Sequence, residues 1–143
     1  MGDRAAHLRY AVERLGEFLL NLSVSSNYET DPVGMSEPQG RFLNAAAVGD
    51  TTLGAGAVLD ALLRIERERG RERPFPLAPR TLDLDLILFG DRTINTPQLV
   101  VPHPRFRERQ FVLEPLAEIA PKLKDPATGR TVGELLAELR RPG

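Results

Sequence analysis

The hydrophobic positions along the chain follow two periods, which predict a mixture of helices and strands. Between residues 4 and 15 the apolar side chains recur at helical spacing, so we expect an amphipathic helix there. From residue 18 to residue 27 apolar and polar residues alternate, and the apolar side chains of one face are Leu20, Leu22 and Val24. This alternation predicts a strand that packs on one face.

A loop and a second strand are expected next. Residues 28–41 contain two prolines and two glycines, so we expect no regular structure there but a long loop of the kind that often binds ligands. Residues 42–48 predict a short strand in which Asn44 is the only polar side chain. From the strand alone, Asn44 is either an amide that the backbone satisfies or a residue that reads a ligand.

The central part of the chain predicts a long helix followed by a basic loop. Thr52 is placed to cap a helix that runs to about Arg69. The apolar stripe expected on its buried face consists of Val58, Leu59, Leu62, Leu63 and Ile65. Glu66 extends this stripe towards the helix end, where it is either solvated or part of a site. The segment from Gly70 to Pro79 predicts a basic, proline-rich loop.

Residues 80–89 predict a strand with one acidic face. Successive side chains of a strand point to opposite faces, so Asp83 and Asp85 share one face. The apolar side chains of the other face are Leu82, Leu84, Leu86 and Leu88. Ionised carboxylates need water, a cation or arginines, and six arginines lie between residues 64 and 80. The pair therefore either holds the metal of a metal-loaded polyphosphate or neutralises neighbouring arginines on a solvated surface.

The last third of the chain predicts short strands and two helices. After a turn at Gly90, extended segments are expected at residues 93–94 and 99–101, and His103 follows between two prolines. A lone histidine in a loop is usually solvated, but the prolines hold this one ready for hydrogen bonding. Residues 109–119 suggest a helix whose continuity Pro115 leaves open. Residues 131–134 form a capping box that opens a terminal helix.

Composition narrows the classes of function. At 143 residues, we expect one domain that spans residues 1–143. A net charge of −1, from 19 basic and 20 acidic residues, argues against nucleic-acid or membrane partners. The chain has no cysteine, which excludes thiol nucleophiles, thiolate metal sites and disulfides. With no apolar signal core or long apolar run in this sequence, we expect a soluble, cytoplasmic protein.

Several runs of residues give the chain a family resemblance. They are Phe42-Leu43-Asn44-Ala45-Ala46, Arg64-Ile65-Glu66, Ala78-Pro79-Arg80-Thr81-Leu82-Asp83-Leu84-Asp85, Val101-Pro102-His103-Pro104 and Arg109-Gln110-Phe111-Val112-Leu113. In these runs and their order, the chain closely resembles the 6-hydroxymethyl-7,8-dihydropterin pyrophosphokinases of folate biosynthesis. The resemblance implies an α/β (α+β) fold, a ferredoxin-like sandwich with a mainly antiparallel sheet. It also implies transfer of the β,γ-diphosphate of ATP to the pterin hydroxymethyl group, which leaves AMP.

The resemblance also assigns roles to individual residues. Asp83 and Asp85 match the ligands of two Mg²⁺ ions that bridge the ATP phosphates, and Arg71 and Arg80 match catalytic arginines. The residues that match the ATP site are Glu66, Arg71, Arg73, Arg80, His103 and Arg109. Those that match the pterin site are Thr30, Val33, Phe42, Asn44 and Phe111. An amide suits a pterin edge because it both donates and accepts hydrogen bonds, and an aromatic face adds stacking.

The start of the chain departs from the family pattern. Family members open with a strand that ends in Gly-Ser-Asn-Leu, and Met1-Gly2-Asp3-Arg4 matches the residues just after it. We expect that the natural start lies upstream; the alternatives are a destabilised form, or another element or chain that fills the gap.

The sequence also leaves two alternative functions, a non-catalytic remnant and an RNA-binding module. A non-catalytic remnant would bind ATP and pterin without forming AMP. An RNA-binding module is disfavoured because the predicted strands carry aliphatic rather than aromatic faces. We expect a monomer with ATP and a pterin as its partners, and leave association with other folate-pathway enzymes open.

Overall fold

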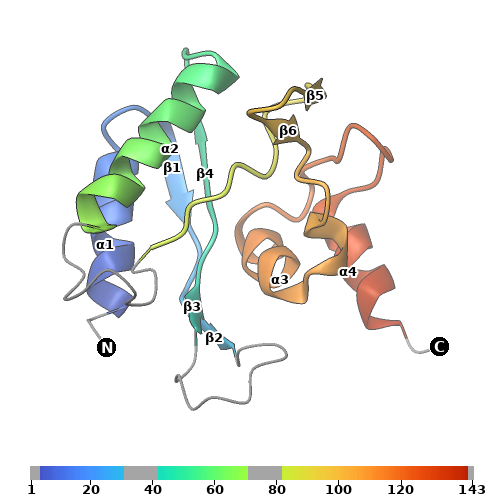
Figure 1. Cartoon of the computed structure of the whole chain (residues 1–143). Helices are drawn as coiled ribbons and strands as arrows, with labels where there is room; N and C mark the ends of the chain where they lie inside the picture. Colours follow the sequence, from blue (N-terminus) through green and yellow to red (C-terminus); the bar gives the residue numbers. More distant parts are fainter. Residues whose placement is uncertain (1–3, 31–41, 71–81, 142–143) are drawn as a thin grey trace. The chain divides into compact units, whose positions relative to one another are not determined.

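Helices and short strands follow one another in groups along the chain (Figure 1). The computed structural model describes residues 4–30, 42–70 and 82–141. The helices are α1 (Arg4–Leu15), α2 (Ala55–Gly70), the short 3-10 helix η1 (Phe106–Glu108), α3 (Gln110–Ile119) and α4 (Val132–Arg140). The strands are β1 (Leu20–Val24), β2 (Tyr28–Thr30), β3 (Phe42–Asn44), β4 (Ala47–Asp50), β5 (Ile94–Asn95) and β6 (Val100–Val101).

The strands pair in twos among the described residues. β1 pairs with β4, β2 with β3 and β5 with β6, the last two pairs being antiparallel. The α+β class predicted from the sequence is confirmed, whereas the ferredoxin-like arrangement stays a prediction. The contacts divide the chain into two compact units, Met1–Leu22 with Gly49–Pro104 and Ser23–Val48 with Arg105–Gly143. The prediction of one domain over residues 1–143 also stays a prediction.

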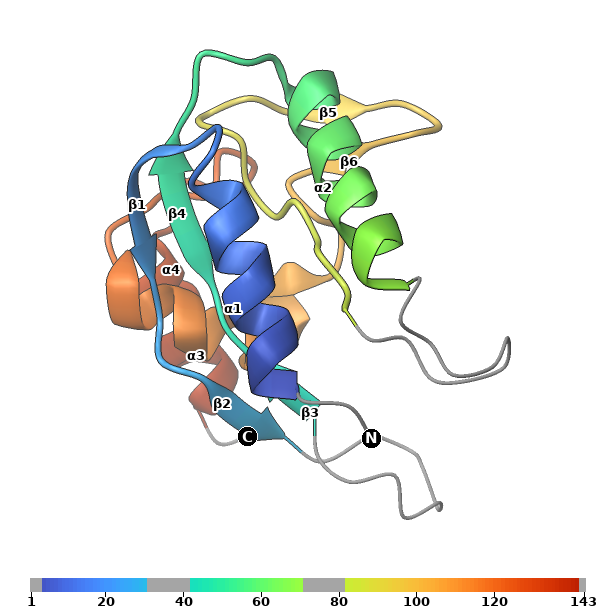
Figure 2. The same ribbon diagram turned by 90° about the vertical axis from the view of Figure 1, so that its left-hand side faces the viewer.

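In the first unit α1 and α2 lie side by side (Figure 2). Their buried side chains share a core with Leu82, and the members contributed by the helices are Ala11, Leu15, Val58, Leu62 and Ile65. The helix predicted at residues 4–15 is confirmed at both ends. Arg14 and Tyr10 of α1 both bond the carboxylate of Glu68 on α2, so polar contacts at the edge of this core add to its apolar packing.

Two details of the α2 prediction are wrong. The helix begins at Ala55 rather than at Thr52, because the Thr51 hydroxyl accepts a hydrogen bond from the backbone N–H of Leu53 and forms a local turn instead. Leu63, expected in the buried stripe, is 41% exposed. It lies one position beyond Leu62, about 100° around the helix, which turns it away from α1.

The strand predictions near residues 18–48 also need correction. The segment expected to be a loop without regular structure begins with β2, and Asn44 lies opposite Tyr28 in the β2–β3 pair. The strand expected at 42–48 is split into β3 and β4. Buried Ser25 explains the split: its N–H donates to Ala46 O at 2.9 Å, and its hydroxyl accepts from Ala46 N at 2.9 Å, so a side chain replaces part of the ladder.

β1 does not pack on one face as the alternation predicts. Leu22 packs against the core, but Leu20 is 64% exposed. Asn21 interrupts the pleat with φ of 54°, in the left-handed region that asparagine tolerates. Its amide donates to the Asp50 carboxylate at 2.9 Å, which fixes this conformation. A local kink therefore rotates neighbouring side chains out of a shared face.

The second unit is built on α3 and α4, whose apolar faces pack around Phe106 of η1. Pro115 does not interrupt α3, so the continuity left open by the sequence is resolved in favour of one helix. The predicted capping box is confirmed: the Thr131 hydroxyl accepts from Glu134 N, and the Glu134 carboxylate accepts from Thr131 N. No helix in residues 4–30, 42–70 and 82–141 is long and apolar enough to cross a membrane.

Candidate active site

The segment that carries the aspartate pair is extended but forms no strand. Residues 82–89 have no regular secondary structure, so the strand predicted at 80–89 is wrong for this part; Arg80 and Thr81 lie outside the described residues. The side chains nevertheless alternate as expected: Leu82 is buried, Leu84 packs against the α1–α2 core, and Asp83 and Asp85 are exposed. Side-chain alternation follows from local conformation, whereas a strand also needs a backbone partner.

Glu66 anchors this segment between the two aspartates. It lies near the end of α2, and one of its carboxylate oxygens accepts a hydrogen bond of 2.5 Å from the backbone N–H of Leu84. A backbone amide bonded to a carboxylate makes a strong, charge-assisted contact. The alternating segment is thus fixed at its midpoint, with Asp83 and Asp85 on either side of the anchored peptide.

His103 is tied to the same segment further along. Its backbone N–H donates to the carbonyl of Ile87 at 2.9 Å, just after the β5–β6 pair and the cis Val101–Pro102 peptide bond. The imidazole is half-buried. The first unit therefore holds Glu66, both aspartates and His103 on three pieces of backbone that hydrogen bonds connect, as a common site requires.

The second unit carries the residues matched to the pterin site, together with Arg109. Arg109 is the N-cap residue of α3 and makes no side-chain cap. Instead its guanidinium carbon lies 5.7 Å from the centre of the Phe111 ring, within the range of a cation–π contact. Phe111 is half-buried in the first turn of α3, and Asn44 is half-buried at the end of β3. An aromatic face, a cation and an amide are thus available in one unit.

Several predicted site residues fall outside the described part of the chain. These are Val33, Arg71, Arg73 and Arg80. For Thr30 and Phe42 the structure describes the backbone alone, and it pairs the two residues opposite each other in β2 and β3.

An ion pair with a buried carboxylate, which the sequence did not predict, fixes the turn before α4. Asp125 is fully buried and accepts hydrogen bonds from Arg107, from the Thr128 hydroxyl and from Ala127 N. The Arg107 guanidinium is the main reason why the pKa of the Asp125 carboxyl is lowered. The Asp-Pro-Ala-Thr-Gly run is a turn signal that marks this site in the sequence. Because Arg107 is two residues before Arg109, the pair also fixes the approach to α3.

A second missed carboxylate, Glu118, joins α3 to the segment before β3. It accepts hydrogen bonds from the Tyr28 hydroxyl at 2.7 Å and from the Ser26 hydroxyl at 2.8 Å. These bonds lower the pKa of Glu118, Tyr28 having the largest effect, and the same contact raises the pKa of Tyr28. Glu118 lies seven residues after Phe111, and residues at this spacing share a helix face. This spacing is the sequence signal that could have identified Glu118.

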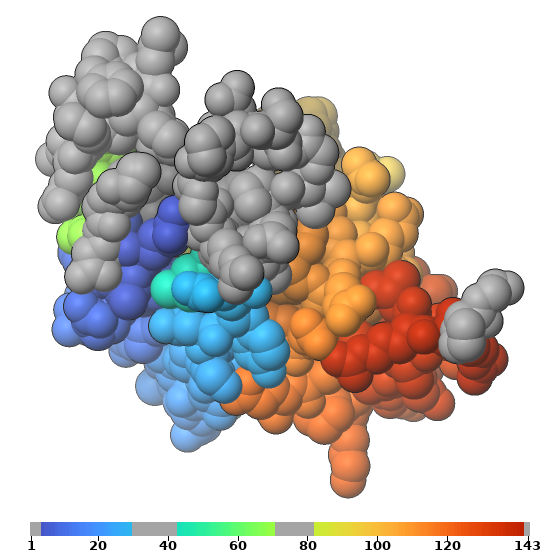
Figure 3. Space-filling model, turned by 90° about the horizontal axis from the view of Figure 1, so that it is seen from below, coloured from blue at the N-terminus to red at the C-terminus, as the bar shows by residue number. Residues whose placement is uncertain are grey.

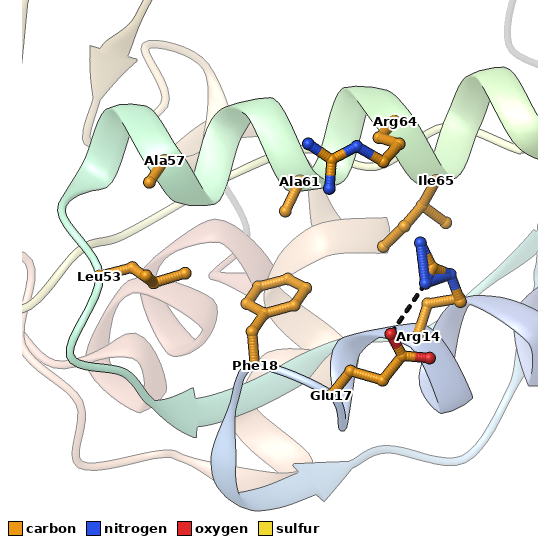
Figure 4. Close-up of a pocket in the computed structure, with 8 residues that line it drawn as sticks. All are labelled: Arg14, Glu17, Phe18, Leu53, Ala57, Ala61, Arg64 and Ile65. Carbon is orange, nitrogen blue, oxygen red and sulfur yellow. Dashed lines mark hydrogen bonds and ion pairs between the residues drawn. The ribbon is translucent and has the colours of Figure 1, made fainter.

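A cavity of about 260 Å³ lies between α1 and α2 of the first unit (Figure 4). Its lining consists of Arg14, Glu17, Phe18, Leu53, Ala57, Ala61, Arg64 and Ile65. Arg14 bonds Glu17 across its edge at 2.9 Å. Among the residues whose side chains the structure describes, none predicted for the ATP or pterin sites lines this cavity.

Comparison with known proteins identifies close relatives. Residues 1–121 match the family model described as 7,8-dihydro-6-hydroxymethylpterin-pyrophosphokinase (HPPK). A protein of Bacillus subtilis named 2-amino-4-hydroxy-6-hydroxymethyldihydropteridine pyrophosphokinase is 48% identical over 130 residues, which cover 90% of this chain and 77% of that protein. Proteins of the same name are 49% identical in Pseudomonas aeruginosa, over 89% of this chain and 76% of theirs, and 41% identical in Methylorubrum extorquens, over 100% and 90%.

Proposed function

The chain belongs to the 7,8-dihydro-6-hydroxymethylpterin-pyrophosphokinase family, and from this premise we propose a role for each site residue. The reaction transfers diphosphate from ATP to the hydroxymethyl group of the dihydropterin, yields AMP and belongs to folate biosynthesis. All the relatives compared above are named as pyrophosphokinases, and none of these findings supports the non-catalytic alternative.

The observation that carries the assignment of roles is the geometry around Leu84. Its N–H is held by Glu66, and the carboxylates on either side of it are exposed. Two exposed carboxylates suit a hard divalent cation, because Mg²⁺ is usually bound by one or two carboxylates together with phosphate oxygens. Asp83 and Asp85 would hold the magnesium that comes with ATP, and we propose two ions. Bound there, the metal supplies charge neutralisation at the transferring phosphates.

The remaining residues of the first unit orient the nucleotide. Glu66 keeps both aspartates in place through the backbone between them. His103, tied through its N–H to Ile87, presents its half-buried imidazole to ATP. We assign the phosphate oxygens to Arg71, Arg73 and Arg80, with Arg71 and Arg80 acting in catalysis. Pyrophosphoryl transfer needs positioning and charge stabilisation more than covalent chemistry, which suits this set of residues.

The second unit orients the acceptor. Asn44 offers its amide to the edge of the pterin ring, and Phe111 stacks on the ring face. Phe42, Thr30 and Val33 complete the pterin site in this proposal. Arg109, above the Phe111 ring, binds ATP from the same helix end. We propose that the enzyme acts as a monomer.

The proposal is tested by measuring AMP release from Mg-ATP with and without 6-hydroxymethyl-7,8-dihydropterin. We expect AMP to form only when the pterin is present, because the pterin hydroxyl is the acceptor. AMP formation at the same rate without pterin, or ATP binding with no AMP at all, would refute the proposed reaction.

A further inference from the structure

The carboxylate of Glu118 gathers hydrogen bonds from a distant part of the chain. Its two oxygens accept from the backbone N–H of Ser26 at 3.2 and 3.0 Å, and one of them also accepts from the hydroxyls of Ser26 and Tyr28. All of these groups belong to the second unit. Figure 3 shows the light-blue atoms of this part of the chain against the orange atoms of α3. We name the set of Ser26, Tyr28 and Glu118 the Glu118 clamp.

The clamp acts on the two elements that carry Asn44 and Phe111. Tyr28 lies directly opposite Asn44 in the antiparallel β2–β3 pair, and residues in such a pair project to the same face. Since the Tyr28 side chain reaches α3, Asn44 lies on the face of the strand pair that is turned towards α3. Phe111 lies seven residues before Glu118, close to two helical turns, so both lie on the same face of α3.

We propose that Glu118 and Tyr28 are positioning residues for the pterin site. The clamp holds the face of β3 that carries Asn44 at a fixed separation from the face of α3 that carries Phe111. The Asn44 amide and the Phe111 ring are then already placed for the edge and the face of the pterin ring. Neither side chain has to move when the pterin binds. This inference rests on the proposed function, because it concerns the same pterin site.

The chemistry of the clamp suits a positioning role. One carboxylate receives three kinds of donor: a backbone N–H, an aliphatic hydroxyl and a phenol. Bonds to a charged acceptor are stronger than bonds between neutral groups, and several bonds converging on one side chain also fix its direction. Because the Tyr28 hydroxyl donates its hydrogen bond to Glu118, we assign Tyr28 no hydrogen bond to the pterin.

Two conservative variants of the full chain test the inference. Tyr28→Phe removes one hydroxyl, and Glu118→Gln removes the charge and places amide hydrogens where only acceptors are needed. We expect the KM for pterin to rise about fivefold in Tyr28→Phe and about tenfold in Glu118→Gln. The KM for ATP should stay unchanged in both. The double variant should be no worse than Glu118→Gln, because both changes break the same contact.

Glu114→Gln is the matched control. Glu114 lies one turn earlier on α3, and its carboxylate pairs with Arg140 of α4 instead of with the strands. This variant should keep the wild-type KM for both substrates. A merely structural clamp would lower the melting temperature of Glu118→Gln and leave its pterin KM unchanged.

The outcomes separate the two hypotheses. An active wild type whose Tyr28→Phe and Glu118→Gln variants both keep the wild-type pterin KM overturns the inference alone. A wild type that forms no pterin-dependent AMP overturns the proposed function, and the inference falls with it. A rise in pterin KM that spares the ATP KM and is absent from Glu114→Gln supports the clamp.

Discussion

The hydrogen bond between Glu66 and Leu84 N makes a direct prediction about catalysis. It is the contact that fixes the peptide between Asp83 and Asp85, with 2.5 Å between the heavy atoms. A hydrogen bond to a charged group contributes about 1.5–3 kcal/mol, and a bond between neutral groups about 0.5–1.5 kcal/mol. Glu66→Ala removes the acceptor altogether. Glu66→Gln keeps a carbonyl acceptor of similar reach and removes the charge.

These values give two different expected losses. If the bond serves to hold the aspartates in place, kcat/KM for Mg-ATP should fall about 10- to 150-fold in Glu66→Ala and about fivefold in Glu66→Gln. The assay is AMP release at saturating pterin with varied Mg-ATP. The KM for pterin should not change, because the pterin residues lie on other elements.

Glu68→Gln serves as the control for Glu66. Glu68 lies two residues further along α2, and its carboxylate bonds Tyr10 and Arg14 of α1, with the two Arg14 bonds at 3.1 and 3.0 Å. Its replacement should lower the free energy of unfolding but leave kcat/KM per folded molecule unchanged. The reasoning is refuted if Glu66→Ala keeps wild-type kcat/KM, or if Glu66→Gln is as impaired as Glu66→Ala.

Three further predictions concern stability, each measured as a free energy of unfolding in urea. Asp125→Asn should cost about 2–4 kcal/mol, since it removes the buried charge that Arg107 pairs with. Because the pKa of Asp125 is lowered in the folded state, its contribution to stability is present above the unfolded pKa and is lost as the pH falls through the folded pKa. An Asp125→Asn variant with unchanged acid sensitivity would contradict this. Thr131→Ala should cost about 1 kcal/mol through loss of the cap, while Thr93→Ala, outside any helix, serves as control. Gly49→Ala should destabilise because its Cβ would lie 2.9 Å from Leu19 Cβ; unchanged stability would show that Leu19 moves at no cost.

The features that the sequence predicted well depend on neighbours along the chain. The spacing of apolar residues marks α1 at both ends, and the Thr131–Glu134 capping box marks the start of α4. The exposure of Asp83 and Asp85 also followed from local alternation. Each of these patterns is complete within a few residues, so periodicity alone is sufficient to find it.

The features that the sequence did not predict depend on distant partners. The alternation at 82–89 says nothing about whether another backbone pairs with it, and the strand prediction failed there. The break after β3 depends on Ser25, 21 residues from Ala46. In the Glu118 clamp, Glu118 bonds Tyr28, which is 90 positions away, and Ser26, which is 92 positions away. Such polar contacts leave no periodic trace, although the seven-residue spacing on α3 gave a partial signal.

The central claim is that Asp83 and Asp85 hold the magnesium of ATP for pyrophosphoryl transfer, and single amide variants test it most directly. Pterin-dependent AMP release would be titrated with Mg²⁺ in Asp83→Asn, Asp85→Asn and Asp91→Asn, the last being an exposed aspartate in the turn after this segment. The account predicts that the first two lose at least about 100-fold in kcat, with partial recovery at high Mg²⁺, and that Asp91→Asn behaves as wild type. Wild-type activity and Mg²⁺ dependence in either of the first two variants would contradict it.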